Sequence, residues 1–229
     1  MFKEKKIFDK TVYYSDFIDV EHFFTSRELV AKNNIDLIAK YLGIKPTNLK
    51  HPNQVHSANI QVAKEEINEY KECDSLIVDN PNLAIYLNFA DCTPIIMYDY
   101  KNNVASIAHA GWRGTVFKIA PLTVKKMTEL YNTNPSDIVA AIGPSISFKH
   151  FETSPEVIKA LSSTISNTKG LIEGRFADLK NINKAQLLEI GVKKIDVCPY
   201  CTIEDNDKFF SYRYENKTTL RHSAIVKVS

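Results

Sequence analysis

The sequence predicts an α+β fold in which helices and a mixed β-sheet form separate layers. Apolar runs of strand length outnumber amphipathic helical patterns, and the two kinds are interspersed along the chain. Hydrophobic residues make up 44% of the 229 residues, which is enough for a sizeable core. The chain carries no internal repeat, linker or low-complexity segment. We therefore expect residues 1–229 to form a single domain.

Short apolar and β-branched runs predict the strands. The first run covers residues 8–16, and the lysine-rich segment 3–6 before it is expected to be a solvated end. The further strands are expected over residues 57–63, 73–78, 83–92, 94–100, 104–111, 137–143, 193–198 and 222–228.

Helical periodicity predicts four helices. They are expected over residues 26–46, 115–131, 154–163 and 179–192. Pro121 lies inside the second of these and should kink that helix or delay its start. Ser154 is a suitable N-cap with Pro155 at the first helical position, and Gly191 ends the last helix.

Composition and charge bound the possible partners. Lysine and arginine number 29 against 27 acidic residues, so the net charge is +2, and the basic residues form no stripe that would bind nucleic acid. No apolar run approaches the roughly 18 residues that span a bilayer, and the N-terminus lacks the apolar core of a signal peptide. We expect a cytoplasmic protein without nucleic-acid or membrane partners, whose four cysteines are thiols or metal ligands.

Three residues at the ends of apolar runs form a candidate metal site. His56, Cys92 and His109 supply the soft and borderline ligands that zinc prefers, and a catalytic zinc keeps three protein ligands and one open position. A bound metal would lower the pKa of its water toward neutrality and so provide a nucleophile. The spacing alone is weak support, because structural zinc sites bring their ligands as close sequence pairs. Asp74 and Asp91 are acids near this site, and for Asp91 a hydrogen bond in the turn is expected in preference to general-base work.

The same residues allow other interpretations. Cys92 is also typical of a small buried core residue, and either histidine of a hydrogen-bonded loop side chain. Without a metal, Cys92 beside His109 would be a nucleophile–base pair, as in a Cys–His hydrolase.

The segment after His109 reads AGWRG and favours ligand binding. Gly111 and Gly114 permit tight turns and close approach of the backbone to a ligand. Arg113 offers a fork of donors for phosphate or, alternatively, forms a surface salt bridge. Trp112 is also consistent with a simple core anchor.

Cys198 and Cys201 enclose Pro-Tyr in the spacing of a thiol-redox motif. A reactive pair of this kind normally opens a helix, whose amides lower the thiol pKa. The residues that follow are charged and turn-like. Paired but structural thiols are therefore the favoured interpretation, with a redox role as the alternative.

Five phrases carry a family resemblance. They are NQVHS (53–57), FADCTP (89–94), HAGWRG (109–114), AIGPSIS (141–147) and FFSYR (209–213). In this order and spacing the chain, from about residue 24 to 226, resembles the YfiH/laccase-domain family. Its members were first labelled multicopper polyphenol oxidases and later assigned as zinc-dependent purine nucleoside phosphorylases with adenosine deaminase and methylthioadenosine phosphorylase activity. The resemblance implies a pair of β-sheet layers flanked by helices, an α/β/β/α arrangement.

The resemblance also implies a site and its ligands. The family's metal ligands fall on His56, Cys92 and His109, which would form the catalytic centre with Zn²⁺, or Cu²⁺ as a possible alternative. The implied partners are purine nucleosides and phosphate, and the protein is expected to be a monomer or weak homodimer. The candidate substrate contacts are Arg27, Gln54, Arg113, Arg213 and Arg221.

The chain departs from the family pattern in two places. The family's early Ser-Thr-Arg precedes a Gly-Gly-Val-Ser segment, whereas here Phe24-Thr25-Ser26-Arg27 runs almost directly into the expected helix, so that loop is shortened or lost. The family's late Thr-Gly-Arg is here Thr219-Leu220-Arg221. The shortened loop makes an inactive binding protein one alternative function, and a copper-dependent polyphenol oxidase is the other. Multicopper chemistry is disfavoured because its centres commonly need about ten histidines, and the chain has six.

Overall fold

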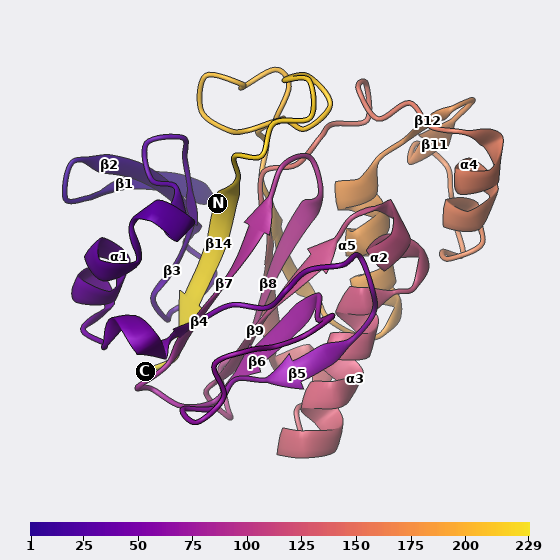
Figure 1. Cartoon of the computed structure of the whole chain (residues 1–229). Helices are drawn as coiled ribbons and strands as arrows, with labels where there is room; N and C mark the ends of the chain where they lie inside the picture. Colours follow the sequence, from indigo (N-terminus) through magenta and orange to yellow (C-terminus); the bar gives the residue numbers. More distant parts are fainter.

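The computed structural model describes residues 1–229 and contains two six-stranded sheets that pack against each other (Figure 1). The first sheet contains, in spatial order, β1 (Phe2–Ile7), β2 (Lys10–Ser15), β3 (His22–Thr25), β14 (His222–Lys227), β7 (Ala84–Phe89) and β4 (Leu49–Lys50). The second contains β13 (Lys194–Val197), β10 (Ile138–Ile142), β8 (Thr93–Asp99), β9 (Val104–Ala110), β6 (Ser75–Val78) and β5 (Ile60–Val62). Both sheets are mixed, because β4–β7, β5–β6 and β10–β13 pair in parallel and the other neighbours are antiparallel.

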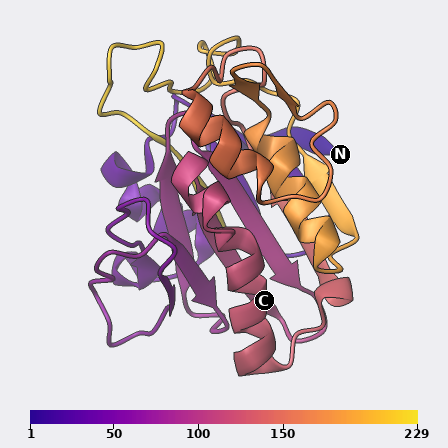
Figure 2. The ribbon, with the colours of Figure 1, turned by 90° about the vertical axis from the view of Figure 1, so that its right-hand side faces the viewer.

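Helices cover the outer faces of both sheets. They are α1 (Ile35–Leu42), α2 (Trp112–Val116), α3 (Ile119–Tyr131), α4 (Pro155–Ser162) and α5 (Leu179–Glu189). Helix α1 packs on the first sheet, and α3 and α5 lie across the second (Figure 2). Single 3₁₀ turns occupy Ala31–Asn33, Pro46–Asn48 and Pro135–Asp137, and a short hairpin pairs β11 (Ile172–Glu173) with β12 (Phe176–Ala177). The predicted α+β class and α/β/β/α layering are confirmed. No helix is both long enough and apolar enough to cross a membrane.

The core lies in three layers because the central strands are covered on both faces. Every residue of β8 and β9 is buried. On β9, Ala105 and Ile107 face the space between the sheets, whereas Val104 and Ala108 face α3. A strand buried on both sides reads as a continuous apolar run, which is why the apolar runs in the sequence located these two strands.

Two predicted elements differ from the structure. Residues 3–6 are not a free solvated end, since they belong to β1, an edge strand that pairs with β2 and leaves half of its side chains exposed. Edge strands tolerate lysines because one side of the strand has no partner. The helix expected over 26–46 is also wrong in its first part: a 3₁₀ turn comes first, and α1 begins only at Ile35.

The helix expected over 115–131 is interrupted near its start. Lys118 adopts a left-handed conformation (φ 57°) and separates α2 from α3. Pro121 then occupies the third position of α3, where its missing N–H has no intrahelical partner to lose. The delayed start agrees with the expectation from this proline.

Candidate metal centre

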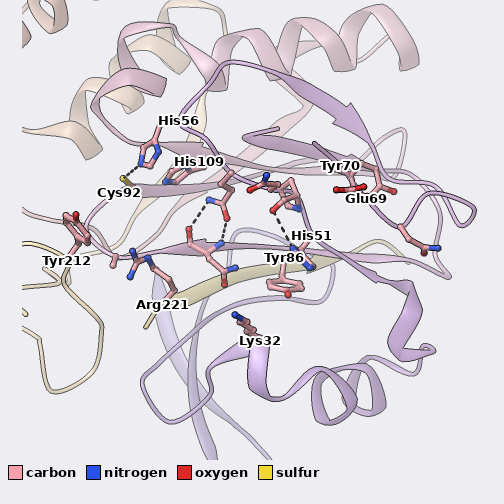
Figure 3. A pocket seen from close by; sticks show the side chains of 16 residues that line it. Lys32, His51, His56, Glu69, Tyr70, Tyr86, Cys92, His109, Tyr212 and Arg221 are labelled. Atoms are coloured by element: carbon pink, nitrogen blue, oxygen red, sulfur yellow. Dashed lines mark hydrogen bonds between the residues drawn. The ribbon is translucent and has the colours of Figure 1, made fainter. Parts of the chain in front are cut away.

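Three segments that are distant in sequence meet at one end of the two sheets. His56 lies in the loop between β4 and β5, Cys92 lies in the connection that passes from β7 in one sheet to β8 in the other, and His109 lies near the end of β9. One potential ligand atom from each lies within 4.8 Å of the others. Cys92 Sγ is 3.9 Å from His56 Nε2, and the two imidazole rings are 4.8 Å apart (Figure 3).

One buried carboxylate holds both histidines in place. Asp74, the residue before β6, accepts a 2.8 Å hydrogen bond from Nδ1 of His109. Its oxygens also accept from the backbone N–H groups of His56 at 3.0 Å and Ser57 at 2.7 Å. Because His109 Nδ1 donates to the carboxylate, the ring's Nε2 is left free to bind a metal.

The charges of the site favour a cation between these groups. Burial acts to raise the pKa of Asp74, but hydrogen bonds from His109 and Ser57 lower it to about 2. Burial likewise acts to raise the pKa of Cys92, and the neighbouring His109 and His56 lower it to about 6. Burial acts to lower the pKa of His109, which the Cys92 thiolate and Asp74 raise to about 9. Two anionic groups thus surround the imidazole, and a divalent cation on Cys92 and the histidines would replace the positive charge that His109 otherwise carries.

The glycine after Ala110 makes room for this cluster. A Cβ on Gly111 would lie 2.8 Å from Cys92 Sγ and 3.3 Å from Cδ2 of His56. A Cβ on Gly114 would lie 2.7 Å from the carbonyl oxygen of His109. Both positions require close approach to the protein's own atoms, whereas the predicted approach of the backbone to a bound ligand stays a prediction. The backbone of Gly111 has φ −64°, which any residue can adopt, so crowding by Cys92 and His56, and not backbone conformation, requires a glycine there.

Asp91 fixes the loop that carries Cys92. It adopts a left-handed conformation (φ 76°), and its carboxylate accepts from Thr202 Oγ1 at 2.6 Å and from the backbone N–H of Arg213 at 2.7 Å. Its carbonyl oxygen accepts from Ser145 Oγ at 2.9 Å. This network matches the expected hydrogen-bonding role of Asp91 in the turn.

A cavity of about 840 Å³ opens beside the centre. Alternate residues of β7 and its extension, Tyr86, Asn88 and Ala90, line one side of it. The other lining residues are Lys32, His51, Pro52, Asn53, Gln54, His56, Asn68, Glu69, Tyr70, Cys92, His109, Tyr212 and Arg221. The cavity therefore has the candidate metal ligands at one end and a wall of aromatic and polar side chains beyond them (Figure 3).

Two of the five predicted substrate contacts lie on this cavity. The side-chain amide of Gln54 hydrogen-bonds to the backbone of Asn88 in β7, as a neighbouring strand would. Its Nε2 donates to the carbonyl of Asn88 at 2.9 Å, and its Oε1 accepts from the N–H of the same residue at 2.8 Å. Arg221 donates through Nη1 to the carbonyls of Thr218 and Leu220. Its other guanidinium nitrogens make no hydrogen bond within the chain, so they can bind a ligand in the cavity.

The other three arginines lie outside the cavity and have different partners. Arg27 forms an ion pair with Glu215 and donates to the carbonyl of Phe209 at 3.1 Å. Arg213 donates to the carbonyl of His150 at 2.7 Å. Arg113 lies over the ring of its neighbour Trp112 at 4.3 Å and forms no salt bridge. A substrate role for these three residues stays a prediction, and none of them lines the cavity.

Sequence reasoning missed several residues of the cavity wall. One of them is the exposed loop residue His51, whose ring packs against Tyr86 at 4.9 Å between centroids. The alternation of Tyr86, Asn88 and Ala90 along one strand, leading toward Cys92, was the available signal. Tyr212 and Lys32 carried no signal, because long-range folding brings them to the cavity.

The remaining cysteines form no disulfide. Burial raises the pKa of Cys198 to about 12, and Cys201 Sγ accepts from the backbone N–H of Ser147 at 3.3 Å. The residues after Cys201 form turns, as predicted, so no helix opens at the pair. These features are those of buried structural thiols.

A second group of potential ligands consists of His150, Cys201 and Glu204. Its histidine and carboxylate hydrogen-bond each other at 3.1 Å, and both side chains are partly exposed. It lacks a buried carboxylate of the kind that orders the first group.

Known proteins resemble the chain over most of its length. The family model described as a multi-copper polyphenol oxidoreductase laccase matches residues 20–229. A purine nucleoside phosphorylase of Bacteroides thetaiotaomicron is 32% identical over 199 residues, which cover 80% of this chain and 74% of that protein. The adenosine deaminase RL5 of an unknown prokaryotic organism is 31% identical over 193 residues, which cover 77% of this chain and 73% of that protein. The crystal structure of YlmD from Geobacillus stearothermophilus is similar with a TM-score of 0.84 and 27% identity over 93% of both chains.

Proposed function

The chain belongs to the YfiH/laccase-domain family, and from this membership and its metal centre we propose a zinc-dependent purine nucleoside phosphorylase that also deaminates adenosine. Relatives named for each activity are 31% or 32% identical to it, which makes the chain an enzyme of this type. The proposed substrates are adenosine, inosine and S-methyl-5′-thioadenosine. Phosphorolysis breaks the N-glycosidic bond and yields the free base and a ribose 1-phosphate.

The convergence of His56, Cys92 and His109 at one end of the cavity carries the proposal. A thiolate and two imidazoles suit zinc, which when bound supplies a Lewis acid and acidifies a water molecule. Asp74 keeps His109 oriented and anchors the loop of His56. The protein's contribution at this end is therefore a set of three donors, two of them held by the hydrogen bonds of one carboxylate.

Arg221 is the proposed phosphate contact. It is the one arginine of the cavity, and Nε and Nη2 have no partner within the chain. A guanidinium with two free nitrogens offers parallel donors that match a phosphate. Arg221, which precedes β14, would in this way hold phosphate on the side of the cavity near the candidate metal ligands.

Copper is the alternative metal. Two histidines and a cysteine are also a ligand set that copper accepts, and the family model is described by its copper chemistry. A multicopper oxidase, however, would need histidines for several ions. The chain has six in all, and only His56 and His109 meet at this centre.

Cellular location and assembly complete the proposal. We place the enzyme in the cytoplasm, in keeping with four cysteines that form no disulfide. A monomer or weak homodimer stays the expectation.

Elemental analysis of the wild type and of Cys92→Ala, paired with a phosphate-dependent assay on adenosine and inosine, tests the proposal. We expect about one zinc per chain in the wild type and loss of both metal and base release in the variant. Cys198→Ala, which changes a buried cysteine outside the centre, is the control and should keep both. Full metal content in Cys92→Ala would overturn the ligand assignment. A zinc-loaded wild type that releases no base would overturn the phosphorylase activity and leave the centre intact.

A further inference from the structure

Tyr86 is a buried tyrosine whose hydroxyl lacks a partner. Its side chain is 2% exposed and lines the cavity, yet the hydroxyl makes no hydrogen bond within the chain. Burial alone raises its pKa to about 12, so the group is a neutral donor. The hydroxyl oxygen is open to the cavity and not fully buried, and a tyrosine in a core normally finds a hydrogen-bond partner for it. A ligand in the cavity can supply that partner.

Tyr86 and the candidate metal ligands line different parts of the same cavity (Figure 3). Tyr86, Asn88 and Ala90 share one face, and four residues of extended strand span roughly 14 Å. His51 packs against Tyr86, and Tyr70 and Glu69 lie farther still from the candidate metal ligands (Figure 3). The cavity is thus continuous from the candidate metal ligands to Tyr86 and His51.

The chemistry of deamination sets the direction of the nucleoside. In that reaction water adds to purine C6 and ammonia leaves, so adenosine and water give inosine and ammonia. C6 must then lie at the metal centre. In a nucleoside the C6 end of the purine and the 5′ end of the ribose point in opposite directions. The 5′ end thus points away from the centre, along β7.

We propose that Tyr86 and His51 form the subsite for the 5′ end of the ribose, with the Tyr86 hydroxyl bound to the nucleoside 5′-hydroxyl. This inference rests on the proposed function and adds a direction of binding to it. The aromatic faces of His51 and Tyr86 also suit an apolar 5′ substituent, such as a methylthio group, whose sulfur packs well against aromatic rings.

Substrate analogues and the variant Tyr86→Phe test the subsite together. The kinetic measurement is kcat/KM of the zinc-loaded enzyme for adenosine, 5′-deoxyadenosine and S-methyl-5′-thioadenosine. We expect Tyr86→Phe to lower kcat/KM for adenosine about tenfold, because one hydrogen bond is lost, and to leave the values for the other two within about twofold. Tyr13→Phe is a matched control: Tyr13 is also buried, burial raises its pKa to about 12, and it lies outside the cavity.

Three results would overturn the inference. An equal loss for all three substrates would place the base, not the 5′ end, at Tyr86. An unchanged kcat/KM for adenosine in Tyr86→Phe would show that Tyr86 does not contact the substrate. The third result comes from binding, because dissociation constants of adenosine and 5′-deoxyadenosine can be measured by calorimetry even without turnover. Equal affinities of the two for the wild type would remove the 5′ contact, whatever the fate of the proposed catalytic activity.

Discussion

Asp74 and His109 are joined twice across neighbouring strands. The backbone N–H of His109 donates to the carbonyl of Asp74 at 2.8 Å, and the imidazole Nδ1 donates to the carboxylate at the same distance. The same carboxylate receives the N–H groups of Val55, His56 and Ser57. One residue thus sets the ring orientation of one candidate metal ligand, His109, and the backbone position of another, His56.

Asp74→Asn should therefore weaken metal binding although no ligand is changed. We expect the zinc affinity to fall about 10- to 100-fold, the usual effect of removing a carboxylate behind a ligating histidine. A competition titration against a chromogenic chelator measures it. Asp36→Asn, an exposed aspartate in the first turn of α1, is the control and should bind zinc as the wild type does. Unchanged affinity in Asp74→Asn would show that the carboxylate does not support the metal ligands.

Gly111→Ala should damage the centre by crowding it. The added Cβ would lie 2.8 Å from Cys92 Sγ, a distance that real Cβ atoms do not keep, so the thiolate must move. The backbone of Gly111 itself allows any residue, and strain in the chain is therefore not the cause. We expect the zinc affinity to fall at least tenfold, whereas circular dichroism of the metal-free protein should still show a wild-type fold. Wild-type zinc affinity would mean that Cys92 can shift without loss of coordination.

His222 predicts a pH dependence of stability that is separate from the metal centre. It is fully buried between Phe89 and Phe209, neither ring nitrogen makes a hydrogen bond, and burial lowers its pKa to about 3. In the unfolded chain the pKa returns to about 6.5, so between these values the unfolded state binds the extra proton. The stability due to the neutral ring is complete above pH 6.5 and is lost as the pH falls toward 3, by about 1.4 kcal/mol per pH unit.

Urea unfolding of the wild type and His222→Phe at pH 7.5, 6.5 and 5.5 measures this effect. The phenylalanine ring keeps the packing and cannot be protonated, so the free energy of unfolding of the variant should depend less on pH. As the pH falls, the free energy of unfolding of the wild type should decrease relative to that of the variant. A difference between the two free energies that stays constant with pH would mean that His222 does not titrate on unfolding.

Sequence reasoning predicted the layers and the three candidate ligands, and it failed where contacts depend on register. His56, Cys92 and His109 stood out because each lies in a distinctive phrase. The bond between Asp74 and His109 depends on the pairing of β6 with β9, which no local pattern specifies. Edge strand β1 was missed for a related reason: only Ile7 of its six side chains is buried, so the strand carries no apolar periodicity.

Arg221 can be distinguished from the other arginines by its dependence on phosphate. If its free guanidinium nitrogens bind the co-substrate, Arg221→Ala should raise KM for phosphate about 10- to 100-fold, the effect of losing a charge-assisted pair. Arg221→Lys keeps the charge without the fork of donors and should recover only part of the loss. Arg113→Ala, outside the cavity, should leave KM for phosphate unchanged. Initial rates at varied phosphate and saturating inosine, with zinc content measured in each variant, provide the comparison. An equal rise in KM for phosphate in Arg113→Ala and Arg221→Ala would contradict this assignment. It would favour phosphate binding in the segment after His109, where the sequence predicted Arg113 as a phosphate contact.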